Sequence, residues 1–228
     1  MNEILSGFLT ALHLIITLDP EVIEISIRSI LISLSATCIG ALIAVPIGAT
    51  ITFSEFPGKR GLVSFIQTLY ALPTVLVGLF VFLLISRAGP FGFLRLLFTP
   101  EGMVIAQTIL ILPILIGLTI SALSGVDPTI RDTLHSLGAT KIQFLRSVVS
   151  EARYAIMAAI VLGFGRAISE VGAAIMIGGN IKGHTRVLTT AISLETSMGN
   201  ISVSIALGII LLMIALVINL LLAIVQNR

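Results

Sequence analysis

Long runs of apolar residues recur along this chain, separated by short polar stretches. Five of these runs are as long as the ~20 apolar residues that a helix needs to cross a bilayer. None alternates apolar and polar residues as a half-buried strand does. The pattern therefore predicts five membrane-spanning helices. The predicted spans cover residues 22–53, 62–85, 103–123, 155–177 and 201–225.

A shorter apolar run precedes the first predicted span. Residues 4–18 are apolar, but this run is shorter than a membrane-spanning helix requires. The sequence Asp-Pro-Glu follows it. We expect residues 1–18 to form a helix lying along the membrane interface, with a sixth crossing as the alternative. Residues 19–228 are then one membrane domain. The predicted fold class is all-α: a polytopic membrane protein with five transmembrane helices and an N-terminal interfacial or sixth helix.

Prolines and small residues modify these spans. Prolines 46, 73 and 113 fall inside the first three runs, where each is expected to kink its helix. Gly165, Ser169 and Ala173 recur at helical spacing in the fourth run, so they are predicted to share one face. Such a stripe of small residues lets a second helix approach closely.

The composition supports a membrane protein. Of 228 residues, 57% are hydrophobic and 11% are charged, against about 25% charged in soluble domains. The formal net charge of +2 is small and scattered, which argues against nucleic acid as a partner. If residues 124–153 are cytoplasmic, seven Lys and Arg residues lie inside and five outside. This agrees weakly with the positive-inside rule.

One segment between the third and fourth spans, residues 127–153, is amphipathic and charged. Asp127 is predicted to cap a first short helix, with Pro128 at its first position. Gly138 can adopt the left-handed conformation that ends a helix, and Thr140 to Gln143 have the form of a capping box that starts a second. The prediction is a rigid pair of helices bent at Gly138.

The apolar residues of this segment indicate which faces are covered. Ile130, Leu134 and Leu137 are expected to form the apolar face of the first short helix. The second short helix is expected to use Ile142, Leu145 and Val149. The pair either connects two spans at the membrane surface or acts as a lever that a soluble partner moves.

The same segment resembles the EAA loop of ABC importer permeases, whose pattern is E-A-A-x-x-x-G followed nine residues later by I-x-L-P. Asp132 stands at the position of the glutamate, Thr133 and Leu134 at the alanines, and Gly138 at the glycine, with Ala139 following. Residues 148–151, Val-Val-Ser-Glu, depart from I-x-L-P in their last two positions.

The resemblance extends over most of residues 19–200. Further stretches are similar to the molybdate and tungstate permeases of this family, and the last of them is most similar to the tungstate branch. They are DPEVIEISIRSILIS, FPGKR, LYALPTVLVGL, GRAISEVGAAIMI and GGNIKGHTRVLTTAI.

The resemblance implies a type I (MetI-like) permease fold, with a cytoplasmic coupling loop at 127–150, in the cell membrane of a prokaryote. It also implies partners: a second copy of the chain, cytoplasmic ABC ATPase subunits, an extracytoplasmic oxyanion-binding protein and membrane lipid. The chain contains no G-x-x-x-x-G-K-[ST] motif. We therefore expect no cofactor in this chain, with ATP and Mg²⁺ bound by the partner ATPase, and no catalytic or metal-binding residue.

Two sets of charged residues are candidates for the transport path. Arg166 and Glu170 are four residues apart in the fourth span, where isolated charges are costly. They are predicted either to pair with each other along the helix or to line the pathway. Lys182, His184 and Arg186 form a cationic loop on the expected outer face, which either meets the anion or its binding protein or is an ordinary solvated loop.

Three functions stay open at this point. The first is the membrane subunit of an ATP-driven importer of tungstate or molybdate, with sulfate, phosphate or ferric ion as other cargoes. The second is a self-sufficient secondary transporter that uses Arg166 and Glu170 as an ion relay, although the paired repeats of such proteins are not evident. The third is a membrane assembly protein that transports nothing.

Overall fold

The computed structural model describes the backbone of residues 2–226 and the side chains of residues 4–220. The outermost parts of the two predicted domains, residue 1 and residues 227–228, lie outside the described residues. All regular elements in the described part are helical. They are α1 (Asn2–Ile16), α2 (Pro20–Phe53), α3 (Lys59–Thr68), η1 (Leu69–Ala71), α4 (Thr74–Ile85), η2 (Gly92–Leu94), α5 (Pro100–Ser124), α6 (Pro128–Ser136), α7 (Lys141–Glu151), α8 (Arg153–Ile168), α9 (Gly172–Gly178), α10 (Leu188–Ser197) and α11 (Ile201–Gln226).

Three helices, α2, α5 and α11, are long and apolar enough to cross a membrane. The number rises to five if two bent helix pairs, α3–η1 with α4 and α7 with α8, each count as one span. The all-α prediction is therefore confirmed, and the number of spans agrees with the expected five. Pro46 and Pro113 lie inside continuous helices, and the kinks expected at these two prolines stay predictions.

Two of the predicted spans are broken where the sequence suggested at most a kink. The chain bends by 98° between α3–η1 and α4, at Leu72 and Pro73. The run 155–177 is divided into α8 and α9 by residues 169–171. A break inside an apolar run is possible where packed protein, rather than lipid, surrounds the freed backbone groups.

Because of the break between α8 and α9, the prediction that Gly165, Ser169 and Ala173 share one helical face is wrong. Gly165 lies in α8 and Ala173 in α9, so the two do not share one helical face. A Cβ built on Gly165 would meet nothing within 4 Å. The close approaches are made elsewhere: a Cβ on Gly78 of α4 would lie 2.9 Å from Ala173 Cα, and one on Gly163 would lie 2.7 Å from Leu115.

A Gly78→Ala variant tests this contact. The added methyl group would clash with the backbone of α9, which cannot rotate away as a side chain can. Overpacking of this kind costs about 1–3 kcal/mol, so the detergent-purified variant should unfold at a lower temperature than the parent. Gly165→Ala is the matched control, because it adds the same group to open space. Equal losses in both variants would contradict the packing.

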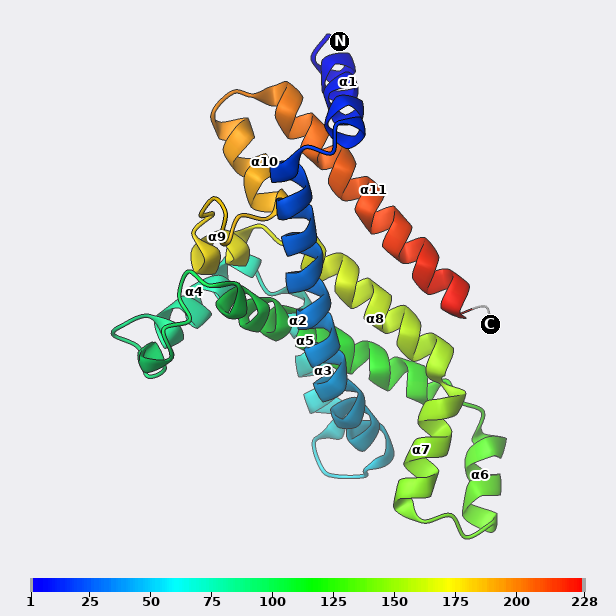
Figure 1. Ribbon diagram of the computed structural model, residues 1–228. Helices are drawn as coiled ribbons and strands as arrows, with labels where there is room; N and C mark the ends of the chain where they lie inside the picture. The colour runs from blue at the N-terminus through cyan, green and yellow to red at the C-terminus, as the bar shows by residue number, and fades with distance from the viewer. Residues whose placement is uncertain (1, 227–228) are drawn as a thin grey trace.

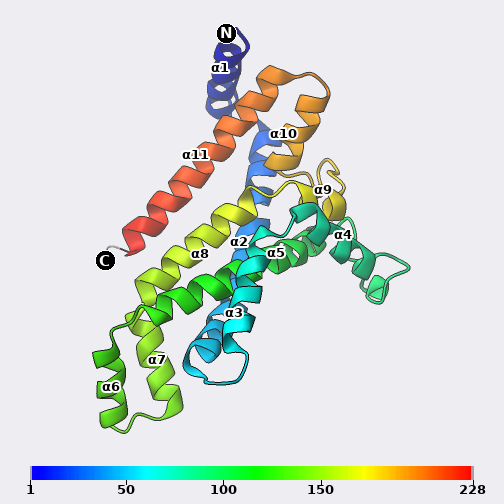
Figure 2. The same cartoon turned by 180° about the vertical axis from the view of Figure 1, so that it is seen from behind.

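The helices pack as a bundle from which one pair projects. Figures 1 and 2 show α5 and α8 crossing α2, while α11 starts beside α1 and α10 and runs away from α2. The pair α6 and α7 extends beyond the end of α5, away from the rest of the bundle. Buried apolar side chains of α5, α7 and α8 join at the base of this projection around Leu123, Val148 and Ile156.

Residues 2–16 form the helix expected near the N-terminus, and α1 packs against the first half of α11 (Figures 1 and 2). A Cβ on Gly7 would lie 2.6 Å from Ile205, so the two backbones approach closely. The opposite side of α1 exposes apolar side chains, including Ile4 and Leu5. The placement of α1 along the interface, and the domain division at residue 18, stay predictions.

Candidate functional site: a projecting helix pair and a broken span

The projecting pair starts and turns where the sequence predicts. The carboxylate of Asp127 accepts a hydrogen bond from the backbone N–H of Thr129 at 2.8 Å, and Pro128 is the first helical residue. This hydrogen bond lowers the pKa of Asp127, because it favours the charged carboxylate. Gly138 has φ +71° between the helices. Such a conformation is strained for any residue with a Cβ, so the bend depends on glycine.

The second helix of the pair has the predicted capping box. The backbone N–H of Gln143 donates to the Thr140 hydroxyl at 3.4 Å, and the Thr140 N–H donates to the Gln143 side chain at 2.9 Å. On the other side of the bend, the backbone N–H of Ala139 donates to the Leu134 carbonyl of α6 at 3.1 Å, so local hydrogen bonds hold both sides. The pair α6–α7 is stiff on both sides of Gly138.

The predicted apolar faces are partly wrong. Leu134, Leu145 and Val149 pack against the core at the base of the pair, as expected, together with Ile130. Leu137 and Ile142, however, are 78% and 80% exposed. Leu137 caps the end of α6, beyond its last packed turn. Ile142 lies two residues before the buried Phe144, and residues two apart on a helix point to nearly opposite sides.

Arg131, which sequence reasoning did not single out, joins the pair to the bundle. The Nη2 of Arg131 donates to the carbonyl oxygens of Leu123, Ser124 and Val126 at 3.0, 2.9 and 2.9 Å. These carbonyls lie at the end of α5, where the last helical carbonyls have no intrahelical partner. Arg131 therefore attaches α6 directly to the end of α5.

An aromatic contact connects the same pair with α2. The ring of Phe53, the last residue of α2, lies edge-on to Phe144 with centroids 5.1 Å apart. The Arg131 guanidinium lies 5.6 Å from the Phe53 centroid, within cation–π range. The His135 ring also packs on Phe144, with the centroids 4.8 Å apart and the rings tilted by 30°. The pair α6–α7 thus contacts the ends of both α2 and α5.

The predicted coupling-loop residues divide into two groups on this pair. Asp132, Thr133 and Gly138 are exposed. Leu134 and Ala139 pack against the core at its base. The structure places all five on one projecting unit, but their role in coupling stays a prediction.

The second candidate region is the break between α8 and α9. Glu170 is 2% exposed, and its Oε1 accepts a hydrogen bond from the backbone N–H of Ala173 at 2.9 Å. The Thr189 hydroxyl donates to the Glu170 carbonyl at 2.8 Å. Glu170 therefore caps the start of α9 and ties the break to α10.

The predicted pairing of Arg166 and Glu170 along one helix is wrong. α8 ends at Ile168, so Glu170 is outside the helix that carries Arg166. The four ion pairs between described side chains involve neither residue. Arg166 is half-buried in the last turn of α8, and its guanidinium makes no hydrogen bond with the described residues.

The two broken spans meet at their breaks. A Cβ on Gly172, the first residue of α9, would lie 2.9 Å from a Val75 methyl and 3.0 Å from the Thr74 hydroxyl. Thr74 begins α4 immediately after the break at Pro73. The N-terminal ends of the two short helices therefore lie side by side, and sequence periodicity gave no sign of this contact.

The cationic loop is partly neutralised. Glu21 at the start of α2 pairs with Lys182 at 2.6 Å and with Arg186 at 3.2 Å. Arg28 donates to the carbonyl of Arg186 at 3.0 Å. His184 is exposed and has no side-chain hydrogen bond among the described residues. The three predicted cations do lie on one loop, although two of them are held by a carboxylate 161 and 165 residues earlier in the sequence.

Comparison with known proteins places this geometry in context. Residues 36–228 match the family model described as "Binding-protein-dependent transport system inner membrane component". The chain is 42% identical over 219 residues to the tungstate uptake system permease protein of Peptoclostridium acidaminophilum, covering 96% of each chain. It is 43% identical to a probable anion ABC transporter permease protein of Haloferax volcanii, over 86% of this chain and 87% of the relative.

A solved structure shows the same fold. The chain aligns with a protein in the crystal structure of an amino acid ABC transporter with histidines, with a TM-score of 0.68 and 20% identity. The alignment covers 94% of this chain and 96% of that chain. The overall arrangement of the helices is therefore shared with that protein.

Proposed function

Because this chain belongs to the family of binding-protein-dependent transport system inner membrane components, we propose that it is the permease subunit of an ATP-driven oxyanion importer. Its cargo is tungstate, with molybdate, sulfate and phosphate as alternatives. The likeness to the tungstate permease of P. acidaminophilum over nearly the whole chain supports this cargo. The chain is a multi-pass component of the inner membrane.

The work of ATP hydrolysis falls to another polypeptide in this proposal, since the chain has no phosphate-binding loop. Two copies of the chain form one pathway, two ATPase subunits bind on the cytoplasmic side, and an extracytoplasmic binding protein delivers the anion. ATP binding draws the ATPases together and moves the projecting pairs, so that the pathway opens alternately to the two sides.

The single observation that carries the mechanism is the attachment of α6–α7 to the bundle through Arg131. A lever must be stiff and must be joined to the elements that it moves. The two caps provide the stiffness, and the three hydrogen bonds from Arg131 provide the joint. A surface helix that merely connected two spans would need neither.

The tip of the pair is the proposed contact with the ATPase. Leu137 and Ile142 flank Gly138 and expose most of their apolar surface in an otherwise polar segment. Exposed apolar side chains grouped at the end of a rigid projection are typical of a protein contact. Asp132 and Thr133 add polar groups on the exposed side of α6.

Arg166 is the proposed cation of the pathway. Its charge has no partner among the described side chains, and an unpaired charge inside a membrane domain is costly unless it faces water or an ion. A passing dianion would supply that partner transiently. The pathway role of Glu170, and the role of Lys182, His184 and Arg186 at the outer face, stay predictions.

Reconstitution tests the function. Proteoliposomes holding the permease, the ATPase and the binding protein are expected to accumulate tungstate when ATP is supplied on the ATPase side. Vesicles without the ATPase are expected to accumulate none, with or without an ion gradient. Gradient-driven accumulation by the permease alone would overturn the proposal in favour of a secondary transporter, and competition with molybdate and sulfate ranks the cargoes.

Substitution at the tip tests the contact with the ATPase. The double variant Leu137→Ser/Ile142→Ser should retain at least ten-fold less ATPase on co-purification, because burial of each side chain contributes about 1.5–3 kcal/mol. The control is Leu94→Ser/Ile181→Ser, which changes the same residue types, also exposed, outside the projecting pair. Equal ATPase recovery from both variants would show that the tip is not the contact.

A further inference from the structure

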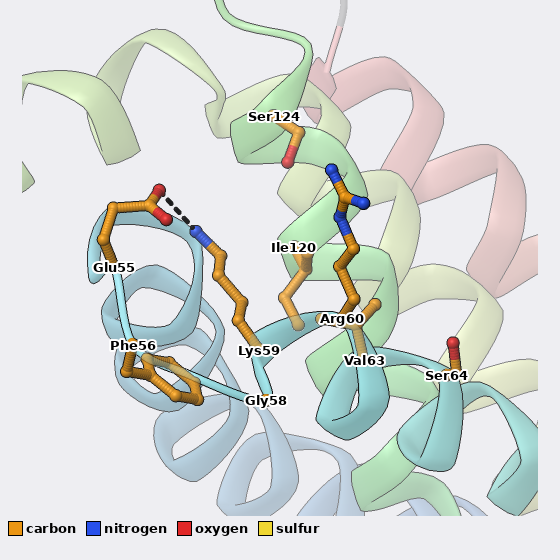
Figure 3. A pocket seen from close by; sticks show the side chains of 9 residues that line it. All are labelled: Glu55, Phe56, Gly58, Lys59, Arg60, Val63, Ser64, Ile120 and Ser124. Atoms are coloured by element: carbon orange, nitrogen blue, oxygen red, sulfur yellow. Dashed lines mark hydrogen bonds and ion pairs between the residues drawn. The ribbon is translucent and has the colours of Figure 1, made fainter.

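A cavity of about 830 Å³ opens beside the base of the projecting pair. It lies between the start of α3 and the end of α5 (Figure 3). The residues that line it come from the α2–α3 connection, the first turns of α3 and the last turn of α5. They are Glu55, Phe56, Gly58, Lys59, Arg60, Val63, Ser64, Ile120 and Ser124.

The two cations at this cavity have different surroundings. Lys59 pairs with Glu55 at 3.2 Å and donates to the Thr52 carbonyl at 2.8 Å, so its charge is already compensated. Arg60 has neither an ion pair nor a side-chain hydrogen bond with the described residues. Figure 3 shows its guanidinium extending across the cavity toward the side chain of Ser124. Arg60 is exposed, so water solvates its charge, and no carboxylate among the described side chains pairs with it.

Two hydroxyl groups line the same cavity, and Figure 3 shows that of Ser124 nearer to this guanidinium than that of Ser64. Ser64 is one turn after Arg60 on α3, and Ser124 ends α5. Neither hydroxyl has a hydrogen-bond partner among the described residues. Val63 and Ile120 contribute apolar side chains to the lining. An arginine fork with hydroxyl donors around it is suited to a tetrahedral oxyanion.

We propose that this cavity binds a tetrahedral oxyanion at the end of the permease that carries α6–α7. This inference rests on the proposed function, in which that end of the permease is cytoplasmic. The ligand is then the transported dianion after it has left the pathway. Arg60 supplies the charge, and the hydroxyls of Ser64 and Ser124 supply neutral donors. A phosphate of an anionic lipid headgroup has the same chemistry and is the other source that the experiment separates.

The position of Ser124 links the cavity to the lever. Its side chain lines the cavity, while its carbonyl oxygen accepts the hydrogen bond from Arg131 at 2.9 Å. An anion held between Arg60 and Ser124 would connect α3 to the residue on which the lever is anchored. An anion bound at this site would thus directly contact the residue that anchors α6–α7.

Equilibrium dialysis of the purified full chain against sodium tungstate measures binding directly. Arg60→Gln is expected to weaken tungstate binding at least ten-fold, and Ser124→Ala two- to five-fold. Glu55→Gln should tighten it several-fold, because it removes the carboxylate that compensates Lys59. Arg95→Gln changes an exposed arginine in the connection between α4 and α5 and is expected to bind as the parent does.

A lipid arm identifies the source of the oxyanion. The parent and Arg60→Gln are placed in nanodiscs of phosphatidylcholine with or without phosphatidylglycerol, and retained lipid is counted by native mass spectrometry. Loss of tungstate binding in Arg60→Gln with unchanged lipid retention supports the transported anion. If Arg60→Gln loses phosphatidylglycerol but keeps tungstate binding, the oxyanion site is occupied by lipid, and the assignment to the transported anion is overturned.

Equal binding of both ligands by the parent and Arg60→Gln would overturn the site altogether. That outcome leaves ATP-driven uptake untouched, so it would not count against the proposed function. Conversely, the absence of ATP-driven uptake with Arg60-dependent tungstate binding would remove the proposed function and keep the site.

Discussion

An Arg131→Ala variant is expected to lose at least nine-tenths of ATP-driven uptake while still binding the ATPase. The substitution removes the donor to three carbonyls at the end of α5 and leaves the exposed tip at Leu137 and Ile142 in place. A hydrogen bond to a charged group contributes about 1.5–3 kcal/mol, and water can replace part of that at this half-buried position. Several such bonds lost together should free the lever from the bundle.

The reason for so large an effect is mechanical. The ATPase can move only what it touches, and the bundle follows only if the contact between α6 and α5 holds during the movement. Without Arg131, the packing around Phe144 and Val148 is still present, but the polar connection to the end of α5 is gone. The expected result is therefore ATP hydrolysis with little accompanying uptake.

Three measurements separate this uncoupling from simple misfolding: the yield of folded permease in detergent, co-purified ATPase, and the ratio of anion transported to ATP hydrolysed. Arg131→Lys should recover part of the ratio, because an ammonium can reach one or two of the carbonyls but lacks the planar group that faces Phe53. Arg87→Ala, at an exposed arginine just after α4, serves as the control. A normal ratio in Arg131→Ala would show that the lever is joined elsewhere.

The parts of this site that the sequence predicts correctly depend on neighbouring residues. Each helix cap is formed by residues at most four positions apart: Asp127 with Pro128, and Thr140 with Gln143. The turn at Gly138 depends only on the backbone freedom of that glycine. Runs of apolar residues long enough to cross a membrane can likewise be recognised in the sequence itself. The helical class and the bent helix pair therefore follow from short-range chemistry.

The parts that the sequence does not predict depend on contacts between distant segments. Glu21 compensates Lys182 across 161 positions, and Thr189 holds Glu170 across 19. A run such as 155–177 is apolar throughout, so its hydropathy does not tell whether lipid or packed helices surround its middle. For that reason the break at residues 169–171, and with it the environment of Glu170, could be found only in the folded chain.

That environment leads to the second large effect, at Glu170. A Glu170→Ala variant is expected to reduce both the amount of folded permease and the uptake it supports. The change leaves the buried N–H of Ala173 without an acceptor, which costs about 1–3 kcal/mol, and removes the cap of α9. Yield from membranes, thermal unfolding in detergent and uptake per folded molecule measure the loss. Glu101→Ala, at an exposed glutamate of α5, is the control.

Glu170→Gln separates the two roles that the sequence leaves open. Glutamine keeps a carbonyl oxygen that can accept from Ala173 but carries no charge. If Glu170 mainly holds the start of α9, this variant should keep most of the yield and most of the uptake. If the negative charge itself lines the path of a dianion, the yield should stay near normal while uptake changes several-fold. Full uptake with normal yield in Glu170→Ala would contradict either role, because a buried carboxylate at the meeting point of two broken spans would then serve neither the fold nor the pathway.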